Sequence, residues 1–164
     1  MRAENVMPSL TLTPIGTVHS EIREPRDEVF GGLTARIELD PARFTPDSLK
    51  GLDEFSHVEV FFYFHQLDDS QIVYATRHPR NRPDWPEVGI FAQRARARPS
   101  RIGSTVCRLV SVEGLTVTVE DLDAIDGTPV LDIKPWMSAM GPRGPVREPA
   151  WAREFSTTYW RPAK

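Results

Sequence analysis

Short stretches in which apolar and polar residues alternate are the main pattern along this chain. Residues 10–18 (LTLTPIGTV) and 33–39 (LTARIEL) alternate in this way, which is typical of β-strands that bury one face. Pro14 places a bend or a sheet edge within the first strand. Residues 58–64 (VEVFFYF) are almost continuously apolar, so we expect this strand to be buried on both faces.

The second half of the chain predicts four further strands. They cover residues 88–92, 104–111, 115–120 and 129–134, and the middle two form a hairpin around Glu113-Gly114. Polar loops are predicted at 21–32 and 66–85. The second of these is long for a loop inside a compact domain, and loops of that length are usually functional or disordered.

Helices are predicted to be short and few. One begins at Pro46, with the preceding threonine as its N-cap. The other covers residues 149–160 and is amphipathic, which would bring Trp151, Phe155 and Tyr159 together on one face.

About seven short strands and two short helices predict a mainly β protein. The β-α alternation of a doubly wound sheet is absent, and a closed or half-closed antiparallel barrel is the natural way to hide the sheet edges. We therefore expect a single antiparallel β-barrel domain with long loops over residues 1–140. Residues 141–164 are expected to form a C-terminal tail with a short helix.

The composition is that of an ordinary globular domain. The chain has 164 residues, and its 15 prolines favour turns and loops over long helices. The one cysteine, Cys107, lies in an apolar stretch and is expected to be a core residue. Because a single cysteine cannot form an internal disulfide, a reducing, cytoplasmic location is expected. We find no signal peptide and no apolar run of membrane-spanning length, and the four histidines do not have zinc-ligand spacing, so neither a membrane nor a metal is expected.

Charge is distributed unevenly along the chain. The net charge is only −3, but 17 of the 20 basic residues are arginines, and seven of these lie between positions 77 and 101. The arginine guanidinium suits phosphate binding and stacking, so this segment is a candidate nucleic-acid surface, although the charge alone favours a solvated loop. The candidate nucleic-acid-binding residues are Arg77, Arg80, Arg82, Arg96, Arg98 and Arg101.

The common nucleotide and zinc motifs (GxGxxG, the P-loop, CxxC and HExxH) are all missing. Three other segments carry distinctive residues: 51–65 (GLDEFSHVEVFFYFH), 88–103 (VGIFAQRARARPSRIG) and 126–136 (DGTPVLDIKPW). With residues 14–20 (PIGTVHS), they resemble the signature blocks of the TsaA-like (YaeB/TrmO) family.

The resemblance implies a β-barrel that binds S-adenosylmethionine without a Rossmann domain. It also implies a homodimer with the cofactor near the subunit boundary. The activity implied is methylation of N6 of threonylcarbamoyl-adenosine in tRNA. The longer bacterial members carry a small C-terminal domain that this chain is expected to lack.

Several residues suit the parts of S-adenosylmethionine. Arg94 follows an apolar strand and could hold the carboxylate with two hydrogen bonds. Gly127 leaves backbone groups accessible in a turn, and Asp126 or Asp132 could accept from the α-amino group or the ribose hydroxyls. With the loop and strand-end positions that the resemblance adds, the candidate cofactor-binding residues are Pro25, Arg26, Asp27, His65, Gln66, Arg94, Ser104, Ile125, Asp126, Gly127, Thr128, Asp132 and Lys134.

Simpler explanations exist for some of these positions. Asp126 has the sequence context of a turn cap, and Lys134 that of a surface residue beside a proline. His57 fits a hydrogen-bonded core histidine, and Trp136 fits core or dimer packing. The chain also departs from the family pattern in the block RPSRIGST, where Ser100 and Ser104 replace the usual residues.

The expected mechanism is an in-line transfer of the methyl group from sulfonium to a nitrogen. Alignment supplies most of the acceleration, and a poor nitrogen nucleophile also needs a base, for which His65 is the preferred candidate. A cofactor-binding sensor or adaptor without turnover is an alternative, as is a methyltransferase that acts on a small molecule.

Overall fold

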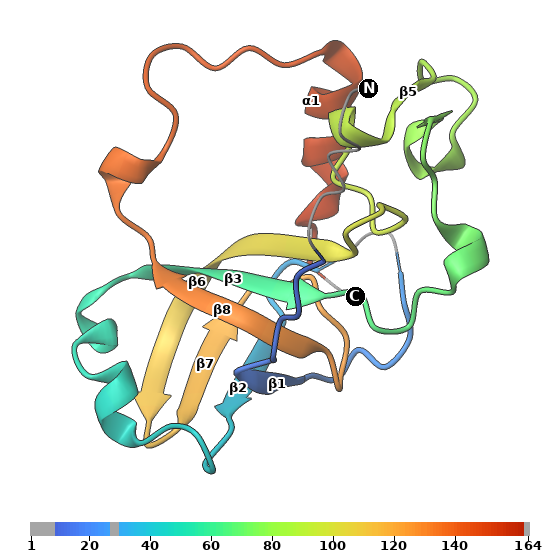
Figure 1. Ribbon diagram of the computed structural model, residues 1–164. Coiled ribbons are helices and arrows are strands. Elements are labelled where there is room, and N and C mark those ends of the chain that lie inside the picture. Colours follow the sequence, from blue (N-terminus) through green and yellow to red (C-terminus); the bar gives the residue numbers. More distant parts are fainter. Residues whose placement is uncertain (1–8, 27–29, 163–164) are drawn as a thin grey trace, which may run out of the picture.

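The computed structural model describes residues 9–26 and 30–162, and its main body is a closed six-stranded barrel (Figure 1). The strands follow the order β1-β2-β7-β6-β3-β8, and each neighbouring pair is antiparallel. Their bounds are β1 Gly16–His19, β2 Thr34–Leu39, β3 His57–Tyr63, β6 Ile102–Glu113, β7 Thr116–Glu120 and β8 Pro129–Pro135. The expected antiparallel barrel is therefore confirmed, and it is closed.

The barrel interior forms the hydrophobic core. Alternate residues of β2 and β3 point inward, and the inward side chains Ile37, Val58 and Val60 are fully buried. Cys107 also lies in this core, as its apolar context predicts. The expectation that β3 is buried on both faces is wrong, because a closed barrel gives each strand only one interior face. Its outward residues, among them Phe61, are only partly covered.

Most predicted strand positions are confirmed, with shifted ends. The hairpin between β6 and β7 forms as predicted. The first strand is shorter than residues 10–18, since Leu10 and Leu12 are exposed and pairing begins at Gly16. The strand expected over residues 88–92 pairs only at β5, Val88–Gly89, with β4, Thr76–Arg77. A 3₁₀ turn then carries Ile90 into a buried position and ends the pairing.

Helical structure is limited to 3₁₀ turns and one α-helix within the described residues. The predicted helix at residue 46 is a 3₁₀ turn, Pro46–Leu49, with no side-chain cap hydrogen bond from Thr45. The other 3₁₀ turns are Leu52–Glu54, Asp69–Gln71, Pro79–Asn81, Ile90–Ala92 and Ser138–Met140. The predicted C-terminal helix is present as α1, Ala150–Tyr159.

Helix α1 lies beside the long segment 66–101 (Figure 1). The rings of Trp151 and Trp85 are 6.1 Å apart, whereas Phe155 stacks on Tyr159 at 4.8 Å. The three aromatic residues of the helix therefore divide between two contacts instead of forming the single cluster expected. No helix among the described residues is both long enough and apolar enough to cross a membrane.

Candidate functional site

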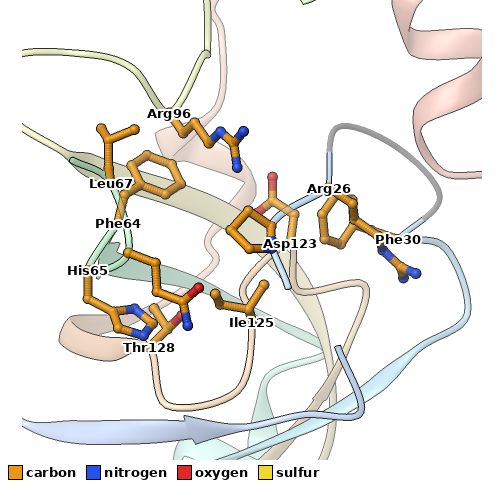
Figure 2. Close-up of a pocket in the computed structure, with 11 residues that line it drawn as sticks. Arg26, Phe30, Phe64, His65, Leu67, Arg96, Asp123, Ile125 and Thr128 are labelled. Atoms are coloured by element: carbon orange, nitrogen blue, oxygen red, sulfur yellow. The ribbon is translucent and has the colours of Figure 1, made fainter. Parts of the chain in front are cut away.

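One rim of the barrel gathers the loops that form a cavity. Because neighbouring strands are antiparallel, β1 and β3 end at this rim and β8 begins there. The segments after β1, after β3 and before β8 therefore meet, and Arg96 of the long segment joins them. We call this the first cavity; its lining residues are Pro25, Arg26, Phe30, Phe64, His65, Gln66, Leu67, Arg96, Asp123, Ile125 and Thr128 (Figure 2).

A second cavity adjoins the first. It shares Phe64 and Asp123 with the first cavity and adds two arginines. The full set is Phe61, Phe62, Phe64, Arg94, Arg98, Ile102, Gly103, Ser104 and Asp123. Each cavity is lined by aromatic side chains and two arginines, but the surface of the first cavity is mainly apolar, whereas that of the second is more polar.

Asp123 is the polar group common to both cavities. Its carboxylate accepts hydrogen bonds from the hydroxyls of Thr105 and Tyr159. Burial raises the pKa of the Asp123 carboxyl, while these two hydrogen bonds and the charge of Arg94 act against that rise. A carboxyl shifted in this direction exchanges its proton closer to neutral pH, as proton-transfer groups in enzymes do.

The turn before β8 is tied to the end of β1. Asp126 accepts a hydrogen bond from the Ser20 amide at 3.0 Å, and the Gly127 amide donates to the Val18 carbonyl at 2.8 Å. Gly127 has φ +77°, a conformation that favours glycine, and a side chain there would begin 3.8 Å from Nε2 of His65. Asp126 therefore anchors this turn, and the turn forms a wall beside His65.

The predicted cofactor-binding residues fall into separate groups. Six line the first cavity: Pro25, Arg26, His65, Gln66, Ile125 and Thr128. Arg94 and Ser104 line the second cavity, where the Arg94 guanidinium donates to the Ser104 carbonyl at 2.5 Å. Asp126 and Gly127 form the adjoining turn, and Asp27 lies outside the described residues.

Asp132 and Lys134 line neither cavity. They lie two residues apart on the same face of β8, where Asp132 stands opposite Phe61 and Lys134 opposite Glu59 of β3. Their side chains form an ion pair that is about half exposed. The physical reason is the strand period of two, which directs both residues to the outer surface of the barrel.

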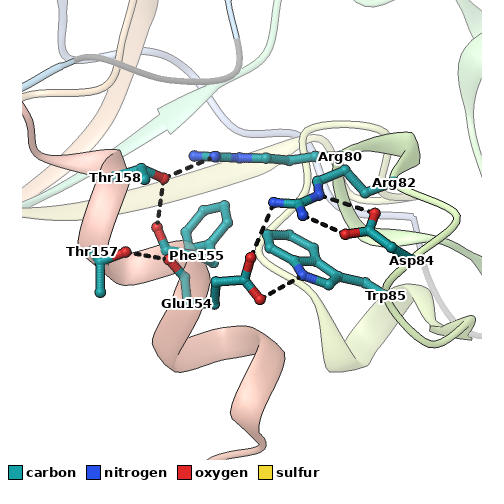
Figure 3. Close-up of polar contacts among 8 residues, drawn as sticks. All are labelled: Arg80, Arg82, Asp84, Trp85, Glu154, Phe155, Thr157 and Thr158. Atoms are coloured by element: carbon teal, nitrogen blue, oxygen red, sulfur yellow. Dashed lines mark hydrogen bonds and ion pairs between the residues drawn. The ribbon is translucent and has the colours of Figure 1, made fainter.

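The predicted nucleic-acid-binding arginines also divide. Arg80 lies over the ring of Phe155 at 4.2 Å, and Arg82 pairs with Asp84 and with Glu154 of α1 (Figure 3). Arg77 donates to Asn81, and Arg101 pairs with Asp69. Within the described part of the chain, the side chains of Arg96 and Arg98 make no hydrogen bond or ion pair, and they face the two cavities.

Sequence reasoning missed Asp123, Phe30, Phe64 and Tyr159 as members of the site. Asp123 stands three residues before the distinctive block at 126–136, a proximity that could have drawn attention to it. Tyr159 has no comparable signal, since it lies on a helix far along the chain. In the described ranges, no group of three or more histidine, cysteine, aspartate or glutamate side chains could hold a metal ion.

Comparison with known proteins gives a consistent result. The model of the family described as the tRNA-methyltransferase O N-terminal domain matches residues 17–141. A probable S-adenosyl-L-methionine-binding protein of Pyrococcus abyssi is 36% identical over 140 residues, which are 82% of this chain and 72% of that protein. The tRNA (adenine(37)-N6)-methyltransferase of Rattus norvegicus is 41% identical over 137 residues, 79% of this chain and 31% of that protein.

Solved structures that resemble this chain belong to the same family as these relatives. A crystal structure of TrmO superposes with a TM-score of 0.70 and 32% identity, covering 86% of this chain and 64% of that one. Another, of TrmO from Pseudomonas aeruginosa, gives 0.70 and 29% identity over 90% and 64%. A putative S-adenosylmethionine-dependent methyltransferase from the same species is 37% identical, and this chain spans 55% of its length.

Proposed function

Since the chain belongs to the family of the tRNA-methyltransferase O N-terminal domain, we propose that it transfers a methyl group from S-adenosylmethionine to an adenine of tRNA. The acceptor we propose is N6 of threonylcarbamoyl-adenosine. The observation that carries the proposal is the pair of cavities at one barrel rim, which share the Asp123 carboxyl. Two binding sites that meet at a titratable group are what a transfer between two bound molecules requires.

The first cavity suits the cofactor. Phe30, Phe64 and Ile125 offer apolar surface for the adenine ring, while Gln66 and Thr128 would bind polar groups of the ribose and methionine parts. When bound, S-adenosylmethionine supplies a methyl group on a cationic sulfur, which departs as a neutral thioether.

The two arginines of the second cavity suit an anionic group. Arg94 keeps the role predicted from the sequence, binding of the cofactor carboxylate, if the cofactor extends past Phe64 into this cavity. Arg98 is then left for an anionic group of the acceptor, because its guanidinium has no partner within the described residues.

The transfer also needs a base. A bond forms between the acceptor nitrogen and the methyl carbon as the carbon–sulfur bond breaks, and the nitrogen gives up its proton. His65 and Asp123 both line the first cavity and could take that proton. The variants His65→Ala and Asp123→Asn distinguish the two candidates. The variant that lacks the base should lose at least tenfold in single-turnover rate, whereas the other variant should change mainly in substrate or cofactor binding. If neither rate falls, both assignments are wrong.

The expected tRNA contact rests on Arg96 and Arg98, which lie at the cavities with their guanidinium groups available. We further propose a homodimer. Val106 and Val110 lie on the outward face of β6, on either side of Arg108, and are 39% and 47% exposed, so that a second subunit could cover these two apolar side chains. A cytoplasmic location follows from the proposed tRNA substrate.

The experiment that tests the proposal is calorimetric titration with S-adenosylmethionine, followed by transfer of a labelled methyl group to bulk tRNA. Binding with transfer supports the methyltransferase, and analysis of the labelled nucleoside then identifies the acceptor atom. Binding without transfer would favour the sensor or the small-molecule methyltransferase. An absence of binding would contradict the cofactor assignment itself.

A further inference from the structure

The C-terminal helix reaches the site although it lies beyond the part of the chain that the family model matches. At its end, the Tyr159 hydroxyl donates a hydrogen bond to the Asp123 carboxylate, 36 residues away in sequence. The Phe30 amide donates to the Tyr159 carbonyl at 3.3 Å, and the two rings lie 5.6 Å apart. Gly31 forms a β-bridge with Pro162. The end of the helix therefore contacts two residues that line the first cavity.

The rest of α1 is docked on the long segment by contacts spaced along one face of the helix. Glu154 accepts a hydrogen bond from the Trp85 indole at 3.0 Å and pairs with Arg82 at 3.3 Å (Figure 3). Phe155 lies beneath the Arg80 guanidinium. Residues three and four apart share a helix face, so these contacts and Tyr159 belong to one packed surface. The position of the Tyr159 hydroxyl is thereby fixed by the whole helix.

We propose that Tyr159 is a positioning residue of the methyl-transfer site: its hydroxyl holds the Asp123 carboxylate between the two cavities, and α1 thereby completes the site. The inference rests on the proposed function, because it assigns a role to Asp123 in that reaction. Tyr159 contacts neither cavity itself and acts through Asp123 and Phe30.

The hydrogen bond from Tyr159 affects the protonation of Asp123, which several other charged groups surround. The titratable groups that line the cavities with Asp123 are Arg26, His65, Arg94, Arg96 and Arg98; the Cys107 thiol of β6 also interacts with Asp123, and the charge of Arg80 acts on Tyr159. Burial, together with the charge of Asp123, raises the pKa values of Tyr159 and Cys107 well above their usual range. Tyr159 therefore stays protonated at neutral pH and can donate to the ionised carboxylate. That hydrogen bond lowers the pKa of Asp123, so its loss raises that pKa further.

Tyr159→Phe in the full chain tests the inference, because it removes only the hydroxyl. A hydrogen bond to a charged group accounts for roughly tenfold in an equilibrium constant. We expect the acid limb of the single-turnover pH profile to move upward by on the order of one unit, and binding of S-adenosylmethionine to weaken. Tyr74→Phe is the matched control, since Tyr74 is 79% exposed and lines neither cavity.

A Tyr159→Phe enzyme with the wild-type pH profile and wild-type affinity would overturn the inference, even if Asp123→Asn is inactive. Should Tyr159→Phe lose its native near-ultraviolet spectrum, Glu154→Gln carries the test. That change loosens the docking of α1 through Trp85 and Arg82 and touches neither cavity, so it must shift the profile in the same direction. If the wild-type chain neither binds the cofactor nor transfers a methyl group, the proposed function fails instead, which is a different result.

Discussion

Gly103 links barrel packing to both cavities, and its replacement by alanine gives a sharp test of the site geometry. A Cβ at this position would lie 2.5 Å from Cε2 of Phe62 and 2.9 Å from Cζ of Phe64. Carbon atoms in contact normally stand about 3.5–4.0 Å apart. At least one ring must therefore move by on the order of 1 Å. Phe62 is a fully buried core residue, and Phe64 lines both cavities.

The expected cost follows from overpacking. Forcing an extra carbon into a packed core costs about 1–3 kcal/mol, and replacing a strand glycine by alanine offsets roughly 0.5–1 kcal/mol of that. We expect the free energy of unfolding to fall by about 1–2 kcal/mol. For a domain of this size, that corresponds to a decrease in Tm of roughly 2–8 °C.

The assay is urea unfolding followed by tryptophan fluorescence, with calorimetric titration of S-adenosylmethionine on the same samples. Gly89→Ala is the matched control, because no atom lies within 4 Å of a Cβ placed there. Gly103→Ala should unfold at a lower urea concentration than Gly89→Ala and bind the cofactor more weakly. If both variants unfold at the wild-type midpoint with unchanged m values, the rings are not held against β6 and the reasoning is refuted.

Two further predictions test the charges of the site. Asp123→Asn removes a carboxyl whose pKa is raised on folding. Because such a carboxyl loses its proton more readily in the unfolded chain, it makes folding less favourable as the pH rises above 3.8, the usual pKa of the group. The stability of the variant relative to wild type, measured by urea titration, should therefore increase as the pH rises from about 4; a stability difference that narrows as the pH rises would contradict the assigned shift. Replacing Arg96 and Arg98 together by alanine should weaken tRNA binding and reduce the slope of log K against log salt by about 1.4–1.8. Arg108→Ala is the control, because Arg108 pairs with Glu120. If the double variant and the control bind tRNA equally well at several salt concentrations, Arg96 and Arg98 do not contact the tRNA.

Local patterns were a good guide to the strands and a poor guide to their surroundings. The alternation over residues 33–39 gave β2 almost residue for residue, because that strand has one buried face in any barrel. The apolar run at residues 58–64 led to the wrong prediction that both faces of the strand are buried, since Phe61 and Tyr63 lie on the outward face of β3. Periodicity cannot distinguish a strand covered by a second layer from one whose outer face carries aromatic residues.

Site residues close to a distinctive block could be found from the sequence, and those brought together by the fold could not. His65, Gln66, Ile125 and Thr128 flank the ends of β3 and β8, where the blocks stand, and they line one cavity. Asp132 belongs to the same block as Thr128 and yet stands on the outer surface. A difference of a few positions along the strand decides whether a side chain lines a cavity or lies on the outer surface, and the amino-acid composition of the segment does not predict which.

The sequence by itself determined the antiparallel strands, the hairpin between β6 and β7, the C-terminal helix and the family, because each depends on residues near one another in the chain. Only the tertiary structure decided that Tyr159 meets Asp123, that Arg80 and Arg82 bind α1, and that two cavities share one carboxyl. The physical reason is that these contacts join segments far apart in sequence. They form only when the barrel closes and the helix docks, and the free energy of both events is spread over many small contacts that no local pattern records.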